Sequence, residues 1–327
     1  MPNPLSHLRD ALLSRLLHPA TLAYFAESKA RGIPLWQRLH GYVYARWAWQ
    51  YIGILSGRHP LGRLLAPLEG LARRLGLISL DTYKRYVDGY HGKVLPVGTE
   101  RQVIKIERPI DVRLPESVLP YPRAREIILE AGADICVIDC PCRLSTPEHC
   151  TPTDVCILVG KVVVEFMLAH NPDKSRRISA DTALAIIRDA QRRGNVTHAF
   201  FKDAVINRFY AICNCCPCCC VALQAHRNGV PTLASSGHVA ALDARACAGC
   251  GLCVRKCAFG AISLATAPPQ GLEGQDAQGG TAHIDTALCM GCGVCALNCP
   301  AGALRLVRAP ERGEPLDVAA TPAPPVN

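Results

Sequence analysis

Two cysteine runs of identical spacing near the C-terminus constrain the fold of this chain more than any other feature. They read Cys247-x2-Cys250-x2-Cys253-x3-Cys257 and Cys289-x2-Cys292-x2-Cys295-x3-Cys299, and they lie 42 residues apart. Each run is followed by a pattern that indicates a short helix and a strand, too little for one half to bury a core alone. We therefore expect the two halves to pack together around the cysteines, with residues 265–281 as a surface loop between them.

Thiolates at this spacing favour a metal centre over a disulfide framework. Sulfur is a soft, strongly donating ligand, and four thiolates complete the tetrahedral coordination of the irons in a cubane iron–sulfur cluster. Zinc is the alternative, although zinc motifs seldom repeat a four-cysteine pattern of this kind twice. Glycines within the runs allow tight turns that direct backbone N–H groups at the sulfides; they are Gly249, Gly251, Gly291 and Gly293.

The chain resembles the bacterial two-cluster [4Fe-4S] ferredoxin family in these eight cysteines and in Pro300, which follows the last of them. The resemblance implies that the fourth cysteine of each run ligates the cluster of the other run. One cluster would then take Cys247, Cys250, Cys253 and Cys299, and the other Cys289, Cys292, Cys295 and Cys257. Ala258 stands where the family usually has proline, a departure that removes no ligand. The resemblance covers about a fifth of the chain.

Eleven further cysteines lie upstream and predict at least one more metal site. The four that make the most regular thiolate set are Cys140, Cys142, Cys150 and Cys156. A dense run, with Cys215, Cys216, Cys218 and Cys219, could supply a neighbouring or shared cluster. Cys136, Cys213 and Cys220 are interpreted as small buried hydrophobic residues. This part looks like the cysteine-rich iron–sulfur proteins of anaerobes that carry such a domain before a two-cluster ferredoxin.

Several polar residues near these cysteines have two interpretations. His149, His198, His226 and His238 are expected to be surface or hydrogen-bonding residues, although a histidine ligand would raise the potential of a cluster. Arg143 could donate hydrogen bonds to cluster sulfides or to a bound anion.

Composition and missing motifs narrow the class of protein. The chain has 327 residues and 19 cysteines, an odd number that argues against a closed disulfide framework and favours a reducing compartment, most simply the cytoplasm. The templates GxGxxG, GxxxxGK[ST] and HExxH are not matched, so flavin, nicotinamide or nucleotide chemistry would have to reside on a partner.

The basic charge of the chain is concentrated at its N-terminal end. Residues 1–80 hold ten Lys and Arg against three acidic residues, a net charge of +7. Nucleic acid is not expected as a partner because no DNA-binding motif accompanies this charge. Residues 41–57 are rich in aromatic residues but too short and polar to span a bilayer. They predict either an aromatic helix packed in a core or a peripheral membrane contact.

The expected fold class is α+β, in four parts. Residues 1–92 form a helical basic region, 93–232 an α/β cysteine-rich domain, 233–310 a two-cluster ferredoxin domain and 311–327 a disordered tail. The patterns predict strands within 93–114, 135–138 and 209–213, and helices over 123–130 and after Ser179 as N-cap. Residues 161–170 fit either type.

These observations predict an iron–sulfur electron-transfer protein or redox subunit. It would relay single electrons through two [4Fe-4S] clusters, and through a further upstream cluster, to or from a redox partner protein. The alternative is an iron–sulfur reductase whose catalytic cluster lies at the upstream cysteines.

Overall fold

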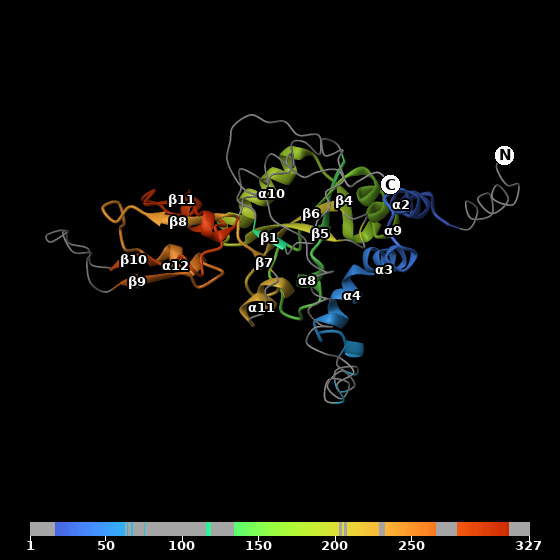
Figure 1. The fold of residues 1–327 in the computed structure, drawn as a ribbon, viewed down its shortest axis with the longest axis horizontal. Coiled ribbons are helices and arrows are strands. Elements are labelled where there is room, and N and C mark those ends of the chain that lie inside the picture. The colour runs from blue at the N-terminus through green and yellow to red at the C-terminus, as the bar shows by residue number, and fades with distance from the viewer. Residues whose placement is uncertain are drawn as a thin grey trace, which may run out of the picture.

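The computed structural model describes residues 17–62, 116–118, 134–202, 208–228, 233–265 and 280–313, together with positions 64, 67, 75 and 205. Its elements form a central sheet with helices around it and a separate C-terminal lobe, coloured orange to red (Figure 1). The strands predicted within 93–114, the helix predicted over 123–130 and the tail beyond residue 313 lie outside the described residues.

Three helices open the described chain, as the sequence predicts for this region: α2 (Pro19–Ala30), α3 (Leu35–Arg46) and α4 (Ala48–Leu55). Proline begins α2, where its missing N–H costs nothing, and His18 Nδ1 accepts the N–H of Ala20 as an N-cap. The ring of Tyr24 on α2 packs on Phe166 of α9 (Lys161–His170) at a centroid distance of 5.3 Å. The N-terminal helices are thereby fixed to the central part of the protein.

Residues 41–57 lie at the junction of α3 and α4. Trp49 is buried, and its indole N–H donates to the carbonyl of Asp139 at 3.0 Å, whereas the ring of Trp47 is exposed. The segment thus contributes to the core with one face, and its contact with a membrane stays a prediction. No helix in the described ranges is long and apolar enough to cross a membrane.

The central sheet has seven strands in the order β4-β2-β3-β6-β5-β1-β7. They are β1 (Glu116–Val118), β2 (Ile135–Asp139), β3 (Asp154–Val159), β4 (Ser175–Arg177), β5 (Val196–Lys202), β6 (Arg208–Cys215) and β7 (Leu233–Ala234). All neighbours pair antiparallel except β1 with β7. Helices combined with a largely antiparallel sheet confirm the α+β class, whereas the division of the chain into four parts stays a prediction.

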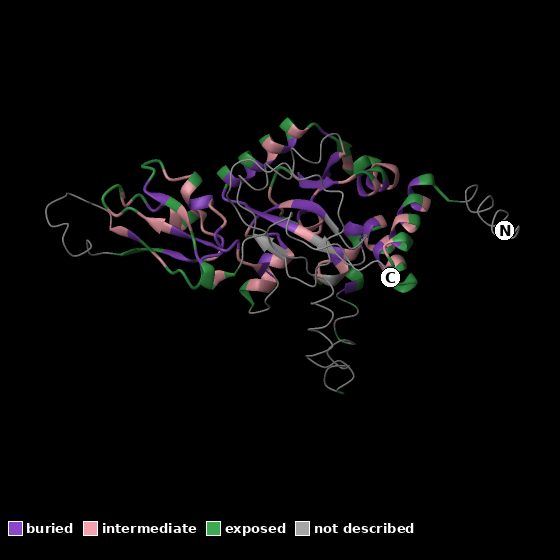
Figure 2. Cartoon of the chain, turned by 45° about the horizontal axis from the view of Figure 1, so that its top comes forward, coloured by how far each residue is buried: buried purple, intermediate pink, exposed green. Residues whose placement is uncertain are grey.

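Helices cover the sheet, and buried residues concentrate along its strands (Figure 2). The predicted helix after Ser179 is confirmed as α10 (Ala180–Arg192), whose first turn is capped by Ser179 Oγ accepting the N–H of Thr182 at 3.2 Å. The ambiguous segment 161–170 is the helix α9. Shorter elements complete this part: α8 (Pro141–Leu144), the 3-10 helix η1 (Pro172–Lys174) and α11 (Val221–Arg227).

A chain of buried polar side chains joins α10 to the sheet. Gln191 Nε2 donates to Thr197 Oγ1 at 2.9 Å, and this hydroxyl donates to Asn214 Oδ1 at 3.0 Å. Asn214 Nδ2 in turn donates to the carbonyl of Val155 at 2.9 Å. Each of the three side chains is at most 2% exposed, so the chain of bonds satisfies groups that water cannot reach.

The C-terminal lobe follows the repeat seen in the sequence. Its elements are β8 (His238–Leu242), α12 (Leu252–Lys256), β9 (Ile262–Ala265), β10 (Thr281–Ile284), α13 (Val294–Leu297), β11 (Leu304–Arg308) and the 3-10 helix η2 (Pro310–Arg312). β8 pairs with β11 and β9 with β10, so each half supplies one strand to each ribbon. The N–H of Asp243 donates to Ala303 and that of Asp285 to Ala261, both at 2.8 Å. The halves are therefore related by an approximate twofold axis.

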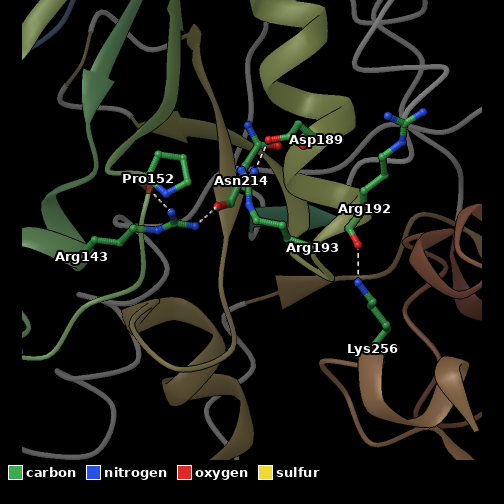
Figure 3. A network of polar contacts seen from close by, with 7 residues as sticks. All are labelled: Arg143, Pro152, Asp189, Arg192, Arg193, Asn214 and Lys256. Atoms are coloured by element: carbon green, nitrogen blue, oxygen red, sulfur yellow. Dashed lines mark hydrogen bonds and ion pairs between the residues drawn. The ribbon is translucent and has the colours of Figure 1, made fainter.

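Polar contacts attach this lobe to the rest of the protein near the end of α10. Lys256 Nζ donates to the carbonyl of Arg192 (Figure 3). Asn298 Nδ2 donates to the carbonyl of Gln191 at 2.9 Å, and Arg227 Nη2 donates to that of Ala258 at 2.9 Å. Because two of these three acceptors are the last carbonyls of one helix, the lobe also satisfies backbone groups that a helix end leaves free.

Gly291→Ala tests how tightly the lobe closes. Gly291 has φ +66°, and a Cβ there would overlap Ser236 Oγ and the carbonyl oxygen of His238, whereas Gly302, at φ +62°, faces open space. Both alanine variants incur the left-handed backbone cost of roughly 1–2 kcal/mol. Because its Cβ also overlaps neighbouring atoms, we expect Gly291→Ala to lower the thermal unfolding midpoint more than Gly302→Ala does, and to reduce the iron content. Equal midpoints for the two variants would contradict the observed packing.

Candidate metal centres

Two hollows in the C-terminal lobe are each lined by four cysteines, three from one run and one from the other. The first hollow contains Cys247, Cys250, Cys253 and Cys299 in its wall. The second contains Cys257, Cys289, Cys292 and Cys295. Apart from cysteine the walls are almost entirely alanine, glycine and larger apolar residues, which exclude water from whatever the sulfurs bind.

Backbone N–H groups point at several of these sulfurs. The N–H of Ala261 donates to Cys257 Sγ and that of Ala303 to Cys299 Sγ, both at 3.3 Å and related by the repeat. The N–H of Ala240 donates to Cys289 Sγ at 3.4 Å. The four glycines predicted to turn the loops all have positive φ, between 62° and 75°. Donors of this kind stabilise a thiolate over a thiol.

The hollows disfavour thiolates that no cation accompanies. Burial, followed by the charge of neighbouring cysteines, raises the pKa of Cys295 to about 12 and also raises the pKa of Cys292. Burial likewise raises the pKa of Cys253. Without a cation these sulfurs would stay protonated near neutral pH, and bound iron removes that penalty because it pairs directly with the thiolate.

A second set of cysteines, here named the outer group, lies beyond the end of the central sheet. It consists of Cys150, Cys216, Cys218 and Cys219, whose four sulfurs all lie within 4.8 Å of one another. The separations are 2.6 Å for Cys150–Cys218, 3.6 Å for Cys218–Cys219 and 3.9 Å for Cys219–Cys150. Cys218 is exposed, Cys150 is half-buried and the other two are buried.

A third set, here named the inner group, lies against the sheet. It consists of Cys140, Cys142, Cys156, Cys213, Cys215, Cys220 and His198. Thiol hydrogen bonds link Cys140 to Cys142 and Cys156, Cys142 to Cys220, and Cys156 to Cys213. The ligand atoms of His198, Cys215 and Cys220 lie within 4.8 Å of one another, and all three residues are buried. The group is thus a contiguous row of six thiols and one imidazole, buried except at the half-buried Cys142 and Cys213.

The structure divides the upstream sets that the sequence suggested. Of the regular set, Cys140, Cys142 and Cys156 are in the inner group and Cys150 is in the outer one. Of the dense run, Cys215 joins the inner group, while Cys216, Cys218 and Cys219 join the outer one. Cys213 and Cys220, interpreted as isolated hydrophobic residues, lie beside other thiols, whereas Cys136 is buried in the apolar core.

His198 lies in the inner group, although the sequence predicted a surface or hydrogen-bonding residue at this position. Register provides the missing signal, since His198 on β5 pairs with Cys213 on β6, and Cys213 pairs with Cys156 on β3. Of the other histidines, His149 contacts the carbonyl of Thr146 at 3.1 Å, His238 contacts that of Ser236 at 2.9 Å, and His226 interacts electrostatically with His198. The ring of His226 packs on Phe259.

Two arginines connect the outer and inner groups. Arg143, 1% exposed, donates through Nη1 to the carbonyl of Pro152 and through Nη2 to that of Asn214 at 3.3 Å (Figure 3). It interacts electrostatically with cysteines of both groups, namely Cys216, Cys140, Cys156 and Cys150. Arg58 donates to the carbonyls of Cys142 at 3.2 Å and Cys219 at 2.9 Å. Positive charge is therefore built in where thiolates gather.

Two inner-group cysteines belong to the same buried cluster as residues that line the second hollow of the C-terminal lobe. One buried cluster contains Val196, Cys215, Cys220, Leu223, Leu233, Ala258 and Met290, with Phe259 and Cys292 packed against it. Met290, Phe259 and Cys292 line the second hollow as well. The two regions consequently share an apolar wall, with no layer of solvent between them.

Comparison with known proteins identifies the C-terminal lobe. Residues 246–303 match the family described as the 4Fe-4S dicluster domain. No curated protein matches the chain. The chain thus carries a ferredoxin-type iron–sulfur domain, and this domain together with the cysteine groups supports a metal-binding, electron-transfer role.

Replacing Arg143 tests whether it supports the cysteine loops. Arg143→Met removes the guanidinium donors to the carbonyls of Pro152 and Asn214, so we expect the free energy of unfolding to fall by about 1–3 kcal/mol. Arg143→Lys should lose less because it keeps the charge and one donor. The control is Arg176→Met, since Arg176 pairs with Asp154 in an exposed ion pair worth at most about 1 kcal/mol. Equal losses for Arg143→Met and Arg176→Met in denaturant unfolding would contradict a supporting role.

Proposed function

We propose that the protein relays single electrons between a redox partner and a metal centre at the inner group, through two [4Fe-4S] clusters in the C-terminal lobe. The observation that carries this proposal is the apolar wall shared by the second hollow and the inner group, which includes Cys292 on one side and Cys215 and Cys220 on the other. A cluster bound to Cys292 would lie close to a centre bound to Cys220. Short separations of this kind permit direct electron transfer through the protein.

The proposed ligands follow the walls of the two hollows. The distal cluster takes Cys247, Cys250, Cys253 and Cys299, and the proximal cluster takes Cys257, Cys289, Cys292 and Cys295. Bound clusters supply one-electron chemistry, while the chain positions them, excludes water and donates N–H groups to sulfur. Cys250 is exposed, which makes the distal end the accessible face for a partner protein.

A second candidate function is reduction of a small substrate at the inner group. The feature that favours it is the phenol of Tyr44, which interacts electrostatically with Cys213 and Cys142 and lies 3.0 Å from the hydroxyl of Tyr210. Burial raises the pKa of Tyr44 well above its ordinary value, so the phenol keeps its proton. A substrate that changes the electron paramagnetic resonance (EPR) spectrum in wild-type protein but not in Tyr44→Phe would favour this function over simple relay.

Paired substitutions test the proposed exchange of ligands. If Cys257 and Cys292 bind the same cluster, Cys257→Ala with Cys292→Ala removes one cluster, about four irons and four sulfides per chain. Cys257→Ala with Cys253→Ala then affects two clusters and removes about eight of each. Iron and sulfide assays on anaerobically purified protein check this. The reverse pattern would show that each run binds its own cluster.

The order of the relay predicts which centres are reduced when a cluster is missing. Protein lacking the proximal cluster should accept an electron from a ferredoxin-type donor at the distal cluster, while the inner group stays oxidised. In protein that lacks the distal cluster, through Cys250→Ala and Cys253→Ala, the donor should reduce both remaining centres slowly. Rapid freeze-quench EPR follows each centre. Unchanged reduction of the inner group in both variants would contradict the relay.

A further inference from the structure

We propose that the outer group, Cys150, Cys216, Cys218 and Cys219, binds a single divalent metal ion of zinc or ferrous type, and not an iron–sulfur cluster. This inference is independent of the proposed relay. It concerns a site separate from the two hollows and from the inner group.

The separations of the sulfurs carry the inference. A tetrahedral ion with metal–sulfur bonds near 2.3 Å holds its ligands about 3.8 Å apart. The observed Cys218–Cys219 and Cys219–Cys150 separations are 3.6 and 3.9 Å. Cys150 and Cys218 are closer, at 2.6 Å, and would have to separate by about 1 Å on binding. A change of side-chain torsion at Cys218 supplies this, since that residue is exposed.

Cubane clusters need a wider arrangement, because each thiolate binds a different iron and the cube itself separates the sulfurs. The C-terminal lobe provides the comparison within the same chain. Among the described residues, which include all eight of its cysteines, no three of these cysteines meet the 4.8 Å separation that all four outer-group sulfurs satisfy. The outer group therefore has no room for a cube between its sulfurs.

The surrounding chain holds the four sulfurs as a built site. Cys216, Cys218 and Cys219 come from one turn, which is fixed from outside by Gln224 Nε2 donating to the carbonyl of Cys218 at 2.7 Å. Arg227 Nη1 donates to the carbonyl of Pro217 in the same turn at 2.8 Å. Cys150 comes from the loop after α8, so an ion would join two loops that are distant in the sequence.

Charge around the site also suits a single ion. Four thiolates and one divalent cation leave a net charge of −2, which needs a positive neighbour when two of the sulfurs are buried. Arg143 interacts with Cys216 and Cys150 from inside the protein. The ion would have a structural consequence for the inner group, because Cys215 and Cys220 flank the turn that it fixes.

The proposal is tested by measuring the metal and inorganic sulfide content of the Cys218→Ser variant. The full-length protein is purified without oxygen. Cys218 is exposed, so the substitution leaves no cavity in the core. We expect the loss of one zinc or one iron per chain, identified by mass spectrometry of the elements, with inorganic sulfide unchanged. Loss of iron together with sulfide would show a cluster, and unchanged metal content would contradict a site in which all four thiolates are needed to hold the ion; either result overturns the proposal.

A control variant and measurements on wild-type protein test the proposal independently of Cys218→Ser. Cys142→Ser, in the inner group, is the matched control, and any metal that it loses should not be the ion lost from Cys218→Ser. X-ray absorption at the zinc edge of wild-type protein should show four sulfur neighbours at about 2.3 Å if the ion is zinc. If the ion is iron, wild-type protein should contain one iron more than its inorganic sulfide. Zinc absent and iron equal to sulfide would overturn the proposal without any substitution.

Discussion

The structure depends on one constraint, which is that many of its thiol groups are buried next to one another. A buried thiolate is unfavourable, and each ionised neighbour makes the next one worse, as the raised pKa of Cys292 and Cys295 records. The structure answers this with donors wherever the sulfurs gather. Backbone N–H groups donate to Cys257, Cys289 and Cys299 in the lobe, and the guanidinium of Arg143 interacts electrostatically with cysteines of both upstream groups. A bound metal would supply the remaining positive charge that the buried thiolates need.

The connection between the lobe and the sheet also depends on buried polar groups that are satisfied by hydrogen bonds. Asn298, next to the cysteine Cys299 of the first hollow, bonds to the carbonyl of Gln191, and the side chain of Gln191 begins the buried series that passes through Thr197 to Asn214. The carbonyl of Asn214 accepts from Arg143. An unbroken line of hydrogen-bonded residues therefore runs from one cluster hollow to the upstream cysteines. Displacing the lobe would leave several of these groups without partners, so its position relative to the inner group is held firmly.

The two repeated runs, together with the ferredoxin resemblance, were sufficient to group the eight C-terminal cysteines by the hollow that each one lines. The eight cysteines of the repeat line two hollows because short loops and two pairs of strands bring each fourth cysteine to the opposite run. Spacing could not divide the upstream cysteines, since Cys150 and Cys156 are six positions apart yet belong to different groups. That division depends on which strand end and which loop each residue occupies. His198 joins the inner group through the register of β5 on β6, and the burial of Arg143 depends on two carbonyls distant in the sequence.

The inner and outer groups differ in their burial and in their contact with the lobe, and these differences suit them to different physical roles. The inner group shares an apolar wall with the lobe and is largely buried, so a metal centre there would be able to exchange electrons with the proposed proximal cluster while water is excluded. The outer group is compact and partly exposed, and its turn is fixed by contacts from α11 that involve no sulfur. An electron carrier gains from ligands that do not move when its charge changes, since motion adds to the energy of each transfer. A redox-inactive ion that fixed the turn between Cys215 and Cys220 would supply that rigidity, whereas a third cluster at this exposed position would add a second route for electrons to leave the relay.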